Sequence, residues 1–208
     1  MDSLLLKSRS VQDTELCMAA VCDGVGSLAD GAFAASSAVW MLSNWFENLE
    51  DTNRLGLRLR DYVSSVNLAI ATKARSKQIE TACTLSCLLL WDEQYCVVHV
   101  GDSRIYLWEG GILCQLTRDQ VRAGRLTSVV GHRTETDIFY MEGIRHGGQR
   151  FLLCSDGLYM RMNLALLAAA MQHLSRRNLQ KTLRQLTDYV IDQGEQDNVS
   201  VAILMNDE

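Results

Sequence analysis

The chain has 208 residues, of which 48% are hydrophobic and 22% charged, and its formal net charge is −5. This length fits one globular domain, which we expect to span residues 1–208, with a core that needs no disulfide or metal to fold. Because the 25 acidic residues outnumber the 20 Lys and Arg, the composition argues against nucleic acid as a partner, whose binding rests on clustered basic residues.

The sequence contains no run of about 18 apolar residues, and charge appears too early in MDSLLLKSRS for a signal peptide. We therefore expect a cytoplasmic protein with no membrane partner. The seven cysteines form no CxxC pair, which favours free thiols over a zinc or redox site. Four of them lie in apolar segments and are predicted to be buried: Cys22, Cys87, Cys96 and Cys154.

Apolar periodicity in the first half predicts strands at 4–6 and 15–22, helices at about 28–49 and 54–77, and strands at 84–91, 94–100, 104–109 and 112–117. The last four strands are joined by short turns, including one at Gly101-Asp102. Because connections this short are typical of hairpins, we expect all of these turns to be hairpins in an antiparallel sheet.

The second half begins with a polar, poorly periodic segment at 118–135, which we interpret as a loop or flap. The elements expected after it are strands at 136–142 and 150–155, helices at about 162–174 and 178–192, and a strand at 198–205. Runs of strands alternating with pairs of helices predict an α+β sandwich, with helix pairs on the outer faces of antiparallel sheets. This order excludes a doubly wound parallel fold, such as a response-regulator receiver domain.

An aspartate borders four of the predicted strands, in AAVCDGVGS, VVHVGDSR, FLLCSDGL and EQDNVSVAIL, at positions Asp23, Asp102, Asp156 and Asp197. Loops gather at strand ends, so these side chains can meet in a cleft. Carboxylates without basic partners repel one another unless a cation neutralises them, and oxygen ligands favour Mg²⁺ or Mn²⁺ over zinc. Glycines after Asp23 and Asp156 would let backbone carbonyls approach a metal. The alternative is that each Asp-Gly or Gly-Asp pair is only a turn.

Six ordered segments resemble the PPM family of metal-dependent Ser/Thr protein phosphatases, also called protein phosphatase type 2C, in its bacterial form. AVCDGVGS is similar to the family's DG-hydrophobic-GG motif, TACTLSCLLL to its GTT-bearing strand, and VGDSRIYLW to its GDSR-Tyr hairpin. LTRDQ resembles the LTxDH segment, LLCSDGLY the SDG-Leu motif, and QDNVSVAIL the terminal DN-strand. The resemblance implies a four-layer α-β-β-α sandwich of two antiparallel sheets, with a shortened flap at 121–135.

The resemblance also implies a metal centre. Asp23 would bridge two Mn²⁺ or Mg²⁺ ions, the Gly24 carbonyl would bind one of them, and Asp156 and Asp197 would complete the other. These acids would act through the metals, which would hold a bridging hydroxide that attacks phosphoserine or phosphothreonine without a covalent intermediate. The implied partners are phosphorylated proteins, the products of a cognate Ser/Thr kinase.

Two further acids have weaker counterparts in the family. Asp102 corresponds to a residue that, together with Asp156, helps to hold a third ion in bacterial relatives. Asp2 is similar to the aspartate of the family's opening strand and would be a weaker metal ligand, although Met1 replaces the usual acid beside it.

Other departures concern the substrate. The family places an Arg just upstream of its first strand to bind the substrate phosphate, and we expect this contact to be missing or to lie outside the present sequence. Ser27 replaces a common Gly, and Gln120 replaces the His of LTxDH, which would weaken the site or remove a group that assists the leaving oxygen. These losses leave open a pseudophosphatase acting as a protein-binding regulatory module, whereas the retained acids favour an enzyme.

The histidines and the flap arginines complete the candidate residues. We expect His99 to be a hydrogen-bonded residue within the sheet, and His132, His146 and His173 to be exposed. Arginine side chains match phosphate geometry, so the flap could contact a phosphoprotein; a solvated loop is the alternative. The flap arginines are Arg118, Arg122, Arg125 and Arg133.

Overall fold

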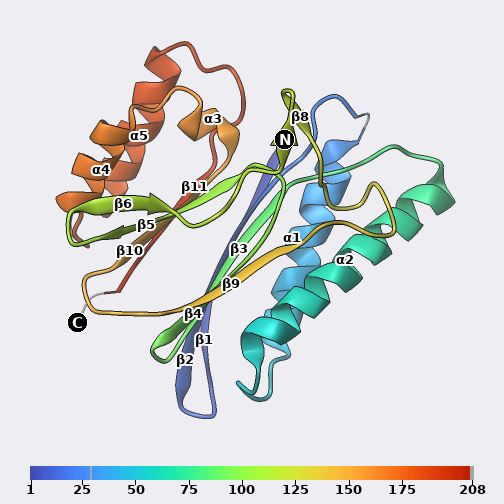
Figure 1. The fold of residues 1–208 in the computed structure, drawn as a ribbon, viewed down its shortest axis with the longest axis horizontal. Coiled ribbons are helices and arrows are strands. Elements are labelled where there is room, and N and C mark those ends of the chain that lie inside the picture. The colour runs from blue at the N-terminus through green and yellow to red at the C-terminus, as the bar shows by residue number, and fades with distance from the viewer. Residues whose placement is uncertain (29, 207–208) are drawn as a thin grey trace.

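The computed structural model describes residues 1–28 and 30–206. Residues 29 and 207–208, which fall within the predicted first helix and the predicted domain, lie outside this description. Two antiparallel sheets lie against each other, and each is covered by helices on its outer side (Figure 1). The predicted combination of helices with antiparallel sheets is therefore confirmed.

The five-stranded sheet consists, in spatial order, of β1 (Asp2–Val11), β2 (Thr14–Asp23), β3 (Leu85–Trp91), β4 (Gln94–Val100) and β9 (Phe139–Ile144). Its outer face is covered by α1 (Gly31–Glu47) and α2 (Leu55–Lys77). The first hairpin is longer than predicted, because the polar stretch after Leu6 is also strand. Lys7 forms an ion pair with Glu47, and Arg9 donates a hydrogen bond to the carbonyl of Phe46, so basic side chains of β1 reach the C-terminal end of α1.

The four-stranded sheet consists, in spatial order, of β11 (Val201–Met205), β10 (Arg150–Cys154), β5 (Arg104–Glu109) and β6 (Ile112–Gln115). Its outer face is covered by α4 (Leu164–Gln172) and α5 (Leu179–Asp192), and a short helix, α3 (Asp156–Tyr159), follows β10 directly. A small hairpin of β7 (Val121–Arg122) and β8 (Arg125–Leu126) lies in the flap. The sequence did not predict α3 or the flap hairpin.

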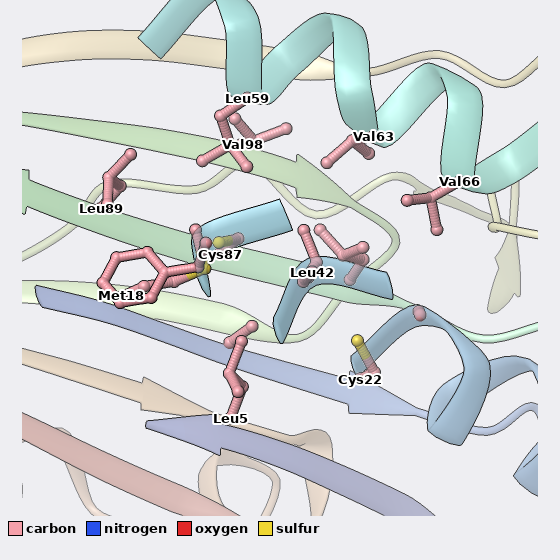
Figure 2. Close-up of a cluster of buried hydrophobic side chains, with 14 of the residues drawn as sticks. Leu5, Met18, Cys22, Leu42, Leu59, Val63, Val66, Cys87, Leu89 and Val98 are labelled. Carbon is pink, nitrogen blue, oxygen red and sulfur yellow. The ribbon is translucent and has the colours of Figure 1, made fainter. Parts of the chain in front are cut away.

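Three buried apolar clusters separate the layers. The largest lies between α1, α2 and the five-stranded sheet, where Leu42, Leu59 and Val63 of the helices share a cluster with Leu89 and Val98 of the sheet (Figure 2). A second cluster fills the space between the two sheets, and a third lies between the four-stranded sheet and α4 and α5. All seven residues of β3 are buried because this strand is covered on both faces. The layers thus run helices, sheet, sheet, helices.

One predicted hairpin is wrong. The strands β4 and β5 do not pair with each other: β4 pairs with β3 and β9, and β5 pairs with β6 and β10. The link at Gly101-Asp102 instead carries the chain from one sheet to the other. Because β9 occupies the free edge of β4, β5 extends the second sheet, where Ile105 and Leu107 join the cluster between the sheets. This crossover places Asp102 at the junction of the two sheets.

Helix boundaries follow local hydrogen bonds. The helix α4 begins after Asn163, whose side-chain oxygen accepts the N–H of Ala165 at 2.8 Å. This cap explains why the helix starts later than predicted, since Asn at such a position satisfies a free backbone donor. Among the described residues, no helix combines the length and apolar character needed to cross a bilayer.

Candidate active site

The sequence-predicted acids meet where the two sheets come together. Asp23 is the last residue of β2 and is the register partner of Asp2 on β1. Asp156 is the first residue of α3, directly after β10, and Asp197 lies in the loop before β11. Asp102 lies in the link between β4 and β5. The strand ends therefore collect acids from both sheets, as the pattern predicted.

The acids affect one another's pKa values. Burial raises the pKa of Asp23 well above its usual range, and the neighbouring carboxyls of Asp2 and Asp156 raise it further. The pKa of Asp156 is raised first by burial and then by Asp197. Burial, followed by Asp156, raises the pKa of Asp102 to about 6. Asp156 is therefore the central member of the group, with an electrostatic neighbour in each of the other segments.

The cluster has unsatisfied oxygen atoms. Both carboxylate oxygens of Asp2 and Oδ1 of Asp156 are buried without a hydrogen-bond partner. The amino group of Met1 lies 3.9 Å from Asp2 Oδ1, but within the described chain no Lys or Arg side chain forms an ion pair with Asp23, Asp102, Asp156 or Asp197. Buried carboxylates without donors are costly unless a cation compensates them.

In the described part of the chain, no three His, Cys, Asp or Glu side chains are arranged so that they could hold a metal ion as they stand. The acids lie instead as neighbouring pairs around Asp156. An all-oxygen donor set with orphaned oxygens fits Mg²⁺ or Mn²⁺, provided that the side chains rotate inward to bind the ion.

The glycines of the two Asp-Gly pairs also have a packing role, and the predicted approach of their backbone carbonyls to a metal stays a prediction. A Cβ atom on Gly24 would lie 2.6 Å from the carbonyl carbon of Gly31, and one on Gly157 would lie 2.3 Å from the carbonyl oxygen of Asn198. Gly24 thus lets the end of β2 pack against the start of α1. Gly157 lets α3 pack against the loop that carries Asp197, which brings Asp156 and Asp197 together.

Two hydroxyl groups that the sequence did not single out connect the acidic segments. The backbone N–H of Asp23 donates to Thr84 Oγ1 at 3.1 Å, and Thr84 Oγ1 lies 2.5 Å from Ser103 Oγ. Ser103 directly follows Asp102, so the pair joins the end of β2 to the crossover. In the sequence, the only indication of this contact is that Thr84 and Ser103 are polar residues next to buried strands.

His99 lies inside the sheet, as predicted. Its Nδ1 lies 2.8 Å from Ser86 Oγ and its Nε2 lies 3.2 Å from the carbonyl oxygen of Arg118. Burial lowers the pKa of His99 to about 4. The other histidines, His132, His146 and His173, are exposed. His99 therefore supports the start of the flap as a neutral, hydrogen-bonded side chain.

Gln120, which stands where a His was expected, is fully engaged by backbone groups. Its Oε1 accepts the N–H of Gly101 at 2.7 Å, and its Nε2 donates to the carbonyl of Asp137 at 3.0 Å. Its own N–H donates to the carbonyl of Gly101 at 2.8 Å. Gln120 therefore ties the crossover to Asp137, just beyond the flap.

Arg104 joins three segments around the crossover. Its Nε and Nη2 donate to the Asp119 carboxylate at 3.0 and 2.7 Å, and its Nη1 donates to the Tyr106 hydroxyl at 3.0 Å. The guanidinium carbon lies 3.5 Å from the ring centroid of Tyr159 at the end of α3. The cation–π contact thus joins the helix that carries Asp156 to β5, which follows Asp102, and the forked ion pair with Asp119 fixes the guanidinium in place.

Among the described residues, the flap arginines do not line the cavity at Asp156 and Asp197. All four are exposed, and Arg118 lines a cavity of about 440 Å³ together with Gln120 and Val121. The flap is anchored at its far end by Asn67, which accepts the N–H of Gly131 at 2.8 Å. A separate open cavity, of about 400 Å³, is lined by Asp156, Gly157, Met160, Arg161, Glu195 and Asp197.

A family model described as protein phosphatase 2C matches residues 2–191. Among curated proteins, the chain is 28% identical over 207 residues to the serine/threonine protein phosphatase PstP of Mycobacterium tuberculosis, covering 88% of this chain and 39% of that protein. It is 26% identical to the serine/threonine phosphatase stp of Listeria monocytogenes, covering 90% of this chain and 83% of that protein. The chain therefore spans about two fifths of the length of the mycobacterial relative.

Solved structures give the same fold. The Mycobacterium tuberculosis PstP structure matches with a TM-score of 0.82 at 22% identity, covering 100% of this chain and 99% of that chain. A catalytic domain of PstP in complex with 2 manganese ions matches with a TM-score of 0.78 at 25% identity, covering 97% of this chain and 96% of that chain.

Proposed function

Because this chain belongs to the protein phosphatase 2C family, we propose that it is a metal-dependent protein phosphatase that hydrolyses phosphoserine and phosphothreonine. The observation that carries this proposal is the convergence of carboxylates from both sheets on Asp156, with buried oxygens that no donor satisfies. Ionised carboxylates in such a group repel one another, and a divalent cation bound by their oxygens would neutralise them.

We propose that two Mn²⁺ or Mg²⁺ ions bind here, with Asp23, the Gly24 carbonyl, Asp156 and Asp197 as ligands. Asp102, together with Asp156, would hold a third, weaker ion, and Asp2 would support Asp23 from the neighbouring strand. Divalent ions in such a site act as Lewis acids on the phosphoryl oxygens and lower the pKa of a bound water. A relative of the same fold has been solved with 2 manganese ions, which supports this choice of metal.

The other residues of the chain keep the ligands in place. Thr84 and Ser103 hold the end of β2 against the crossover, and Gln120 fixes the Gly101 backbone beside Asp102. Arg104 holds α3, and with it Asp156, near the same crossover. Rigid support of this kind keeps several ligands oriented toward one point, which lowers the cost of binding an ion.

The substrates that we propose are proteins phosphorylated by a Ser/Thr kinase. A cytoplasmic location stays a prediction from the sequence, and residues 1–208 are proposed to form one catalytic domain. We do not propose the pseudophosphatase alternative, because the relatives named above are phosphatases and the acids that a metal centre needs converge.

The test is hydrolysis of para-nitrophenyl phosphate and of a phosphothreonine peptide by the chelator-treated protein, with and without added Mn²⁺ or Mg²⁺. We expect turnover of both substrates only when a divalent ion is present, and recovery of activity when Mn²⁺ is added after EDTA. Full turnover in excess EDTA would contradict a metal-dependent reaction. A folded, Mn²⁺-supplied protein without turnover would contradict the enzyme.

A further inference from the structure

Arg161 lies beside two of the proposed metal ligands. It follows α3 in the chain and lines the open cavity of about 400 Å³ together with Asp156 and Asp197. It is the basic residue among the side chains that line this cavity. A single positive charge thus faces the opening through which an anionic substrate would reach the acids of the second sheet.

The guanidinium group of Arg161 is held at one end and free at the other. Its Nε lies 3.7 Å from Glu195 Oε2, and the other oxygen of Glu195 accepts the N–H groups of Gln196 and Asp197 at 2.9 and 3.0 Å. The terminal nitrogens of Arg161 make no hydrogen bond within the described chain, and its side chain is 53% exposed. The free fork matches a phosphate group.

The other arginines near the site have different roles or positions. Arg104 directs all three of its nitrogens to Asp119 and Tyr106 and stacks on the ring of Tyr159, so its fork is already committed to contacts within the protein. Arg118 lines the other cavity, beside Gln120. Arg161 therefore combines a free fork with a place next to the acidic cluster.

We propose that Arg161 binds the phosphoryl group of the substrate at the Asp156 and Asp197 side of the site. This inference rests on the proposed function and deepens it, because it names the residue that offsets the charge of a phosphate dianion next to a group of carboxylates. The contact depends on the phosphoryl group, so it serves small aryl phosphates and phosphopeptides alike. Glu195 is the residue that positions the fork.

The test compares Arg161→Ala with Arg161→Lys in the Mn²⁺-loaded protein. In Arg161→Ala, KM for para-nitrophenyl phosphate and for a phosphothreonine peptide should rise about tenfold or more, with a smaller change in kcat. Arg161→Lys keeps the charge without the fork and should lie between Arg161→Ala and wild type. Arg184→Ala, which removes an exposed arginine of α5, is the matched control and should keep wild-type constants.

Binding of inorganic phosphate, measured by calorimetry, gives a readout that needs no turnover. Its dissociation constant should rise by a similar factor in Arg161→Ala and stay unchanged in Arg184→Ala. Unchanged KM and phosphate affinity in Arg161→Ala would overturn the proposal. A rise in KM confined to peptides with acidic side chains would also overturn it, since Arg161 would then bind a carboxylate. If wild type shows no turnover, the proposed function fails, and phosphate affinity still decides the role of Arg161.

Discussion

In the five-stranded sheet, Asp2 and Asp23 reach the site as register partners at the end of a ten-residue strand pair. In the four-stranded sheet, Asp156 and Asp197 lie beyond the ends of the strands, in a short helix and a loop. Strand register places the first pair, whereas contacts between loops place the second, such as the close approach of Gly157 to Asn198. The comparison indicates that the second sheet can adjust around a ligand more easily than the first.

The strongest way to break this arrangement is to neutralise its central acid. We expect Asp156→Asn to lower kcat/KM by several orders of magnitude while the protein stays folded, because the substitution removes a proposed ligand and also relieves repulsion. Without metal, its melting temperature should equal or exceed that of wild type. Asp188→Asn, an exposed acid on α5, is the control. A much lower melting temperature for metal-free Asp156→Asn would mean that the carboxylate is structural.

Separating the two acids of the second sheet should have the next largest effect. Gly157→Ala places a Cβ 2.3 Å from a backbone carbonyl oxygen, so we expect a loss of about 3 kcal/mol in unfolding free energy and reduced activity. Chemical denaturation checks the stability. Gly26→Ala is the matched control, since its Cβ would meet nothing within 4 Å. Equal stabilities for the two variants would show that the loop contact does not hold the acids together.

The contact of Arg104 with Tyr159 of α3 can be weakened without changing any acid of the cluster. Arg104→Lys loses the fork to Asp119 and the stacking on Tyr159, and we expect it to lower the unfolding free energy by about 2–3 kcal/mol. Arg60→Lys alters an exposed pair with Asp61 and should change it by less than about 1 kcal/mol. Similar losses in both variants would argue against a special role for Arg104.

The smallest expected effect is the pH dependence of stability that His99 contributes in the five-stranded sheet. The pKa of His99 is about 4 in the folded protein and near 6.5 in the unfolded chain. The unfolded chain therefore binds more protons between these values, so this contribution to stability is present above pH 6.5 and is lost as pH falls toward 4. Between pH 6.5 and pH 5 the loss should be about 1–2 kcal/mol. His99→Gln should reduce this pH dependence in denaturation curves, whereas His132→Gln, at an exposed site, should not.

The sequence predicted much of this structure because its signals are local. Apolar periodicity indicated most of the strands and helices, and the strand-end acids at Asp23 and Asp156 indicated the candidate site. The crossover at Gly101-Asp102 could not be predicted, since a short link looks the same in a hairpin and in a change of sheet. The strand that pairs with the free edge of β4 decides between the two arrangements. Here that strand is β9, which lies far from β4 in the chain.

Two residues near the candidate site, Gln120 and Arg161, make contacts that no local sequence pattern indicates. From the sequence, Gln120 was only the replacement of an expected His. Its structural role is seen in the hydrogen bonds that its side chain makes with Gly101 and Asp137. Arg161 belongs to no motif, and its neighbour Glu195 lies on a different segment. The contacts of such residues can be seen only once the fold has brought distant segments together.

The central claim is that acids from both sheets form one metal centre, and a calorimetric titration of Mn²⁺ into chelator-treated protein tests it most directly. Wild type should bind Mn²⁺, and both Asp23→Asn on the five-stranded sheet and Asp156→Asn on the four-stranded sheet should weaken binding at least about tenfold. Undiminished Mn²⁺ affinity in either folded variant, or no binding by wild type, would contradict a centre shared between the two sheets.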